Sequence, residues 1–225
     1  MTVDADPVAE LPDPRDYGLA VVGEEEIPAE LTSLVAEVRS LVDAVARTRA
    51  GAEELSAARA AVAAAAAQLR DGPRHDVGTM VRRTWDDGRV EYGTLTNAVA
   101  GPTNAAAPPL RLETAPEGGL RAQVRLNGTY QGPPGLVHGG WLAALLDQAL
   151  GAAAVAEGMP GLTANLDVDY RRPTPLNTPL EITSRVTGTE RRKVSVAAEI
   201  RHDGEVTAEG TAIMVRLNLP GDGGA

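Results

Sequence analysis

The sequence contains no cysteine and a single lysine, and only 3% of its 225 residues are aromatic. Without cysteine the chain has no thiol nucleophile, no disulfide and no sulfur ligand for a metal. The three histidines, His75, His138 and His202, lie far apart along the chain and lack the spacing of a metal site. We therefore expect neither a bound metal nor another cofactor.

Negative charge is concentrated at the start of the chain. The net charge is −10, but residues 1–30 hold nine acids and one base, a net −8 that leaves −2 for the remainder. Residues 1–28 are rich in proline, aspartate and glutamate, which predicts an acidic, flexible leader. The near-neutral remainder disfavours general nucleic-acid binding.

The sequence also lacks the segments that direct a chain into or across a membrane. The start has no basic stretch followed by an apolar one, and we find no apolar run of the length that spans a bilayer. We therefore expect a cytoplasmic protein that does not associate with membranes.

Residues 29–71 are predicted to form a helical extension. Pro28 suits a helix start, and Gly51 is expected to break the segment before a second, alanine-rich helix. The first helix carries an apolar stripe at helical spacing, made of Leu31, Leu34, Val38, Leu41 and Val45. The second contains Leu55, Val62 and Leu69. We interpret the stripe as a packing or dimer surface rather than a functional groove.

Residues 72–103 are predicted to be an irregular linker, with a possible hairpin around Asp86-Asp87-Gly88. The organised region follows over residues 104–219. Two strands over 110–126 precede a long apolar helix, and four further strands follow it. This order predicts an α+β domain in which a mostly antiparallel sheet wraps one buried helix.

The apolar helix opens on His138-Gly139-Gly140 and carries one acid, Asp147. Glycine at a helix start lets a ligand approach free backbone N–H groups, and a carboxylate in a buried helix is costly unless it has a task. Together they indicate an oxyanion donor and a base. A tight entry turn and a hydrogen-bonded structural aspartate remain the alternative.

The spacing of these two groups constrains the assembly. Gly139 and Asp147 are eight residues apart, which is roughly 12 Å along a helix. Reacting groups must converge to about 3 Å. A shared site therefore requires two antiparallel copies of the helix, and so a homodimer.

A longer pattern surrounds this helix. Gly132-Pro133-Pro134-Gly135 lies upstream of the His-Gly-Gly, Thr163-Ala164-Asn165-Leu166 follows Asp147, and Tyr170-Arg171-Arg172-Pro173 comes next. Over roughly residues 104–218 this sequence resembles the PaaI-type acyl-CoA thioesterases, especially the animal thioesterase superfamily members four and five. The resemblance implies the hotdog fold, in which an antiparallel sheet wraps a long central helix, and dimers that often pair into tetramers.

The resemblance assigns roles position by position. Asp147 matches the acid that activates water or attacks the thioester, and the Gly139 N–H matches the oxyanion donor. His138 and Gly140 match that corner of the substrate site, and Thr163 matches a hydroxyl near the acid. Some PaaI-type enzymes carry an asparagine six residues before the histidine, where this chain has Gly132.

The implied substrate, acyl-CoA, carries phosphates that need local cations. The candidates are the clusters Arg171-Arg172 and Arg191-Arg192-Lys193. Such clusters are usually solvated strand ends, so that interpretation stays open. Two other functions also stay open. A hotdog domain can bind acyl-CoA as a sensor without hydrolysing it, although a pure binder would not need the acid. A dehydratase or hydratase of the same fold would use a different pattern of histidine and acid.

Overall fold

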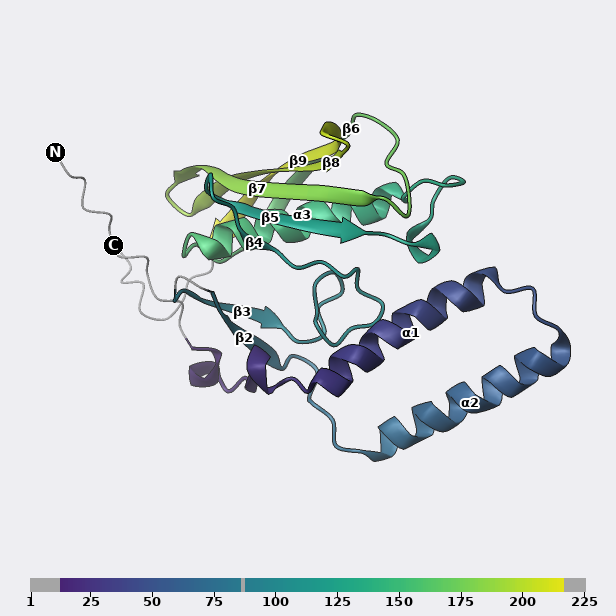
Figure 1. Ribbon diagram of the computed structural model, residues 1–225. Helices are drawn as coiled ribbons and strands as arrows, with labels where there is room; N and C mark the ends of the chain where they lie inside the picture. Colours follow the sequence, from purple (N-terminus) through teal and green to yellow (C-terminus); the bar gives the residue numbers. More distant parts are fainter. Residues whose placement is uncertain (1–12, 86–87, 217–225) are drawn as a thin grey trace.

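The computed structural model describes residues 13–85 and 88–216. Figure 1 shows a curved antiparallel sheet wrapped around one central helix, with the N-terminal part of the chain on the other side of that helix. The sheet has the order β4-β5-β7-β8-β9-β6, and every neighbouring pair is antiparallel. The elements of this domain are β4 (Glu113–Thr114), β5 (Leu120–Arg125), η3 (Gly128–Tyr130), α3 (Gly139–Ala156), β6 (Gly161–Tyr170), β7 (Pro179–Glu190), β8 (Lys193–His202) and β9 (Glu205–Arg216).

This arrangement confirms the α+β hotdog architecture and the order of two strands, one helix and four strands. Strand β5 shows why alternating apolar residues predict a strand here, because its residues alternate strictly between buried and exposed. Its apolar side chains pack on α3, as do those of β7, β8 and β9, and together they form one hydrophobic core.

The central helix is not buried all round, which corrects the expectation from its composition. Leu145, Leu146 and Leu150 are fully buried against the sheet. Gly140 and Asp147, on another face, remain partly or fully exposed. The exposed side of the helix carries small residues. The sequence therefore looks apolar on every face, although in a single chain one stripe of the helix is exposed to solvent.

By length and composition Gly139–Ala156 could also cross a membrane, with a mean hydropathy of 1.3. This corrects the expectation that no segment reaches that length. In the structure the helix packs beneath the sheet as the core helix of the domain.

Strand β6 forms one edge of the sheet. It is ten residues long, and most of its side chains are exposed, including Leu162 and Tyr170. One side of β6 pairs with β9. A long, open edge strand is a template for pairing with another chain.

The start of the chain differs from the expected flexible leader. Residues 13–28 include η1 (Pro14–Tyr17), β1 (Val21–Gly23) and η2 (Glu24–Glu26). Strand β1 pairs in parallel with β2 (Met80–Thr84), and a Glu24 oxygen lies 2.5 Å from Nη1 of Arg111. The acids therefore bind arginines of the body, which composition alone does not reveal. Residues 1–12 lie outside the described part of the chain.

The predicted hairpin is present in residues 72–103. Strand β2 pairs in antiparallel fashion with β3 (Val90–Thr94), and with β1 they form a separate three-stranded sheet. Of the residues proposed for the turn, Gly88 is described and has a φ of 84°. Asp86 and Asp87 lie outside the described residues.

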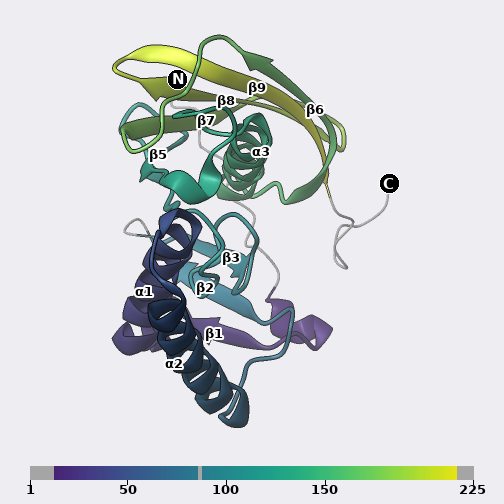
Figure 2. The same cartoon turned by 90° about the vertical axis from the view of Figure 1, so that its right-hand side faces the viewer.

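The helical extension consists of α1 (Ala29–Arg47) and α2 (Ala52–Asp71). Figure 2 shows both helices below the sheet and α3. One face of α1 touches the body. Val35 is buried there, and Arg39 Nε donates to the Ala107 carbonyl at 3.0 Å. In α2 no residue is buried.

Candidate active site

The N-terminus of α3 presents a backbone donor. His138 is the N-cap, and its Nδ1 accepts a hydrogen bond from the Gly140 N–H at 2.9 Å. The N–H groups of Trp141 and Leu142 donate to the His138 carbonyl. Within residues 13–85 and 88–216, nothing accepts the N–H of Gly139. Of the two glycines, Gly140 therefore uses its N–H in the hydrogen bond to His138. Gly139 has a free N–H at the positive end of the helix dipole.

Tyr170 fixes the position of this helix start, a contact that the sequence analysis missed. Its hydroxyl donates to the Gly139 carbonyl at 3.0 Å. A Cβ at position 139 would lie 3.4 Å from the Tyr170 ring, which is ordinary van der Waals contact, so the ring packs directly against this position. The available signal was the position of Tyr170 at the head of the Tyr-Arg-Arg-Pro motif.

Asp147 lies two turns further along α3 and contacts the first half of β6. The Thr163 hydroxyl donates to Asp147 Oδ1 at 2.9 Å and lies 3.6 Å from the sulfur of Met214. Strand β6 shifts register against β9 between Thr163 and Asn165, next to this contact. The structure thus brings together two residues that are sixteen positions apart in sequence, and it leaves the carboxylate partly exposed.

The donor and the carboxylate of one chain occupy different places along β6. Gly139 contacts Tyr170, the last residue of the strand, whereas Asp147 contacts Thr163 near its start. At about 3.3 Å per residue, the Cα atoms of Thr163 and Tyr170 lie roughly 20 Å apart along the strand, and the helix residues that they contact lie roughly 12 Å apart along α3. One chain therefore offers the two halves of a reaction centre at separate points.

Gly132, where some related enzymes have asparagine, is held against the histidine. A Cβ built there would lie 2.8 Å from the Cα of His138 and 3.1 Å from its Cβ. The two segments are joined by a bridge between Gln131 and Val137. The glycine therefore allows the chain before α3 to close tightly around the N-cap, and this backbone has no room for the side chain.

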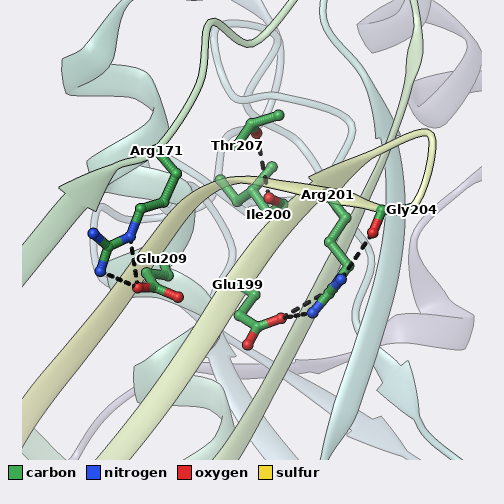
Figure 3. Close-up of polar contacts among 7 residues, drawn as sticks. All are labelled: Arg171, Glu199, Ile200, Arg201, Gly204, Thr207 and Glu209. Carbon is green, nitrogen blue, oxygen red and sulfur yellow. Dashed lines mark hydrogen bonds and ion pairs between the residues drawn. The ribbon is translucent and has the colours of Figure 1, made fainter.

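The Arg171-Arg172 cluster is neutralised by carboxylates on the sheet. As Figure 3 shows, Arg171 reaches Glu209, with Nε and Nη2 at 2.8 and 2.5 Å from one carboxylate oxygen. Asp169 accepts a further bond, and Arg172 lies 2.9 Å from Glu205. The hydrogen bond to Glu209, with the charges of Asp169 and Glu209, raises the pKa of Arg171 above its ordinary value. Both guanidinium groups already have acidic partners.

The Arg191-Arg192-Lys193 cluster forms the turn between β7 and β8. Arg191 has a φ of 52°, and Arg192 Nη2 donates to the Arg216 carbonyl at 3.0 Å. Among the described residues no carboxylate pairs with any of the three. Lys193 and Arg216 lie at the end of the sheet where β6 begins, so the turn is at the Thr163 end.

A cavity of about 350 Å³ lies between the N-terminal segment and α3. Its wall includes Gln148, the neighbour of Asp147, but neither Asp147 nor Gly139. Glu91 lines it, and burial raises the pKa of this carboxyl, partly offset by the charge of Arg83. This cavity is therefore beside the candidate site rather than part of it.

The sheet around one helix, with a capped helix start and a carboxylate on that helix, defines a hotdog domain. The sequence model of the thioesterase superfamily matches residues 134–209, which include both groups. A thioesterase superfamily protein of known crystal structure is 35% identical, with a TM-score of 0.73 over 82% of this chain and 90% of that one. The chain belongs to the thioesterase superfamily.

Curated relatives match a shorter segment. Acyl-coenzyme A thioesterase THEM4 of Xenopus laevis is 43% identical over 89 residues, and that of Mus musculus is 38% identical over 90. These matches cover 39% of this chain and 39–40% of the relatives. The chain therefore matches less than half the length of these two proteins.

Proposed function

We propose that this protein hydrolyses acyl-CoA thioesters to a free acid and CoA. The observation that carries the proposal is the placement of Asp147, hydrogen-bonded to Thr163, on the same helix whose start presents the Gly139 N–H. Similarity to the acyl-coenzyme A thioesterase THEM4 supports the choice of substrate. Membership of the thioesterase superfamily supports the type of reaction.

The chemistry requires a base or nucleophile and a site for negative charge. Asp147 removes a proton from water as the water oxygen attacks the thioester carbonyl carbon, or its carboxylate attacks that carbon directly. Either route breaks the C–S bond, and CoA leaves as the thiolate and then takes up a proton. In the second route water then hydrolyses the mixed anhydride on Asp147, which releases the free acid and restores the carboxylate. In both routes the carbonyl oxygen becomes an oxyanion. The fixed N–H of Gly139 stabilises that charge, usually the largest single contribution in such reactions.

The reaction centre is shared between two subunits. In one chain the donor and the carboxylate contact opposite ends of β6, and both the α3 stripe and the β6 edge are open. A second copy related by a two-fold axis pairs with β6 and sets its α3 antiparallel to the first. That arrangement brings Gly139 of one chain to Asp147 of the other, twice per dimer.

The phosphates of CoA bind at the turn between β7 and β8. The charges of Arg191, Arg192 and Lys193 have no carboxylate partner within the described residues, whereas Arg171 and Arg172 do. A phosphate bound at Arg171 would have to compete with Glu209. A polyanion can therefore bind at the turn without breaking an existing ion pair, which lowers the free-energy cost of binding.

The test is turnover of a panel of acyl-CoAs, followed with a thiol reagent that reports free CoA. Asp147→Asn keeps size and hydrogen bonding but removes basicity, so turnover should fall by on the order of 10² while acyl-CoA binding persists. Asp203→Asn, an exposed acid in the turn between β8 and β9, is the matched control and should leave the rate unchanged.

Two outcomes would contradict the proposal. If the parent protein binds acyl-CoA but releases no CoA, the domain is a sensor. If Asp147→Asn turns over at a near-parental rate, the base lies elsewhere in the molecule.

A further inference from the structure

The two helices of the extension carry apolar stripes of the same spacing. On α1 the stripe is Leu31, Leu34, Val38, Leu41 and Val45, with steps of three and four residues. On α2 the same steps give Leu55, Ala58, Val62, Ala65 and Leu69. Alternating steps of three and four place apolar residues along one seam, as in helices that pack pairwise into coiled coils.

These seams are largely open to solvent. On α2 all five seam residues are exposed, and Leu55, Val62 and Leu69 are 47%, 45% and 54% exposed. On α1 the face that contacts the body carries Val35 and Arg39, whereas Val45 on the seam is 63% exposed. Together α1 and α2 expose seven large apolar side chains. The surface of a monomer normally exposes such side chains singly and scattered.

The chain does not cover its own seams. Residues 48–51 join the helices, and a connection of this length allows antiparallel neighbours to pack against each other. Nevertheless α1 and α2 hardly touch each other, and Figure 1 shows them running in opposite directions. In proteins most of the stability of a helix comes from packing of its apolar face. A partner that covers the open seam would therefore stabilise α2 beyond what its alanine-rich sequence provides.

We propose that this partner is the helical arm, α1 with α2, of a second copy of the chain. Counted outward from the connection at residues 48–51, the large seam residues of α1 and α2 have the same spacing, with a constant offset of one residue. The matching positions are Val45 with Leu55, Val38 with Val62, and Leu31 with Leu69. Helix α1 of one copy and α2 of the other then fit in antiparallel register, and two-fold symmetry forms the same contact twice.

Charge and size agree with self-association. The arm over residues 29–71 carries six acids and five bases, so two arms do not repel each other strongly although the chain has a net charge of −10. A near-neutral arm also lacks the basic face that attracts helices to anionic lipid. Each helix is about 30 Å long and 10 Å wide, so two arms would bury on the order of 1,200 Å², the lower end for specific interfaces.

The arm contact is separate from the pairing through β6. Figure 2 shows β6 on one side of the domain and the two helices on the other. Pairing through the arms therefore adds to a dimer formed through β6 and assembles dimers into larger species. It also makes the inference independent of the proposed activity, because a chain without turnover can still pair through its arms.

The first experiment measures mass in solution by multi-angle light scattering on the full chain. The seam variant carries Leu55→Gln, Val62→Gln and Leu69→Gln. The control carries Ala60→Gln, Ala64→Gln and Ala67→Gln on the opposite face of α2, where all three are exposed. We expect the seam variant to have half the mass of the parent and the control to match the parent. Equal masses for all three proteins would overturn the proposal.

The second experiment uses the absence of cysteine from the chain. In the double variant Val38→Cys with Val62→Cys, mild oxidation should link two chains covalently, as seen on a non-reducing gel. The control Val38→Cys with Ala60→Cys should stay unlinked. A disulfide within one chain would mean that each arm closes on itself, and no disulfide would mean that the seams do not meet. Either result would overturn the proposal.

Discussion

At the scale of single residues, glycines near the start of α3 serve different purposes. Gly139 exposes its N–H and contacts Tyr170, whereas Gly132 lets the backbone of His138 approach. At Gly132 the backbone of His138 excludes a side chain, whereas at Gly139 a Cβ would be in ordinary contact with Tyr170. The asparagine of some related enzymes at position 132 is therefore incompatible with this backbone. In the proposed mechanism another group would have to hold the water, and the Thr163 hydroxyl, which donates to Asp147, is a candidate.

Gly132→Ala tests this interpretation. The added Cβ would lie 2.8 Å from a backbone atom of His138, so the N-cap must move. We expect a loss of about 1–3 kcal/mol in the free energy of unfolding, typical of overpacking, together with a lower kcat/KM for acyl-CoA. Thermal or urea unfolding and steady-state kinetics measure the two effects. Gly188→Ala is the control, because its Cβ meets nothing within 4 Å. Two variants with the same stability would contradict the close approach.

At the scale of elements, the sequence predicts best what local periodicity determines. The alternation in β5 and the long apolar run of α3 are properties of neighbouring residues, and both elements appear where expected. Strand β1 was missed because its three residues pair with β2, almost sixty positions away, and no local pattern reports that contact. The acidic composition of residues 13–28 instead suggested a leader without structure.

The sequence predicted part of the candidate site and missed the rest. The pairing of Asp147 with Thr163 followed from a resemblance and is present as a 2.9 Å hydrogen bond. The contact of Tyr170 with Gly139 depends on how β6 crosses the start of α3, which no sequence period encodes. The sequence did not predict the open stripe on α3 for another reason. Small apolar residues are found both in a core and on a surface that faces a second subunit, so composition does not distinguish the two.

The turn between β7 and β8 carries a prediction at this scale. Replacing Arg191, Arg192 and Lys193 by alanine should lower kcat/KM for acyl-CoA more than for a small thioester without the nucleotide, because phosphate contacts act remotely from the thioester. The difference should shrink as salt rises, since charges are screened within about 8–10 Å at ordinary ionic strength. The measurement is the ratio of the two kcat/KM values, variant against parent, at low and high salt.

The matched control replaces Arg171 and Arg172 by alanine, where the guanidinium groups already pair with Glu209 and Glu205. This pair of changes should leave the ratio close to that of the parent. If the turn variant leaves the ratio unchanged and the control lowers it, the phosphate site lies at Arg171 and Arg172 instead.

At the scale of the whole molecule, the described part of one chain has two open surfaces, and we propose a different assembly for each. The edge of β6, with the stripe on α3, exposes the two halves of the proposed reaction centre. The helices α1 and α2, which carry the seams, lie below the sheet and α3 in Figure 2. The first surface is tied to activity and the second to size, so loss of the arm contact should reduce mass without abolishing turnover.

The shared reaction centre predicts that two inactive variants restore each other. Gly139→Pro removes only the donor N–H, because proline suits the first position of a helix and His138 before it is already extended. Alone, this variant and Asp147→Asn should each have little activity. A mixed dimer has one intact site, formed by Gly139 of one chain and Asp147 of the other, and one site that lacks both groups. If subunits pair at random, half of the dimers are mixed, so co-refolding or co-expression should recover about a quarter of parental turnover. Gly139→Ala, which keeps the N–H, is the control and should retain more activity than Gly139→Pro. If the mixture is no more active than the average of its components, each chain must hold a complete site, and the two-fold arrangement of α3 is wrong.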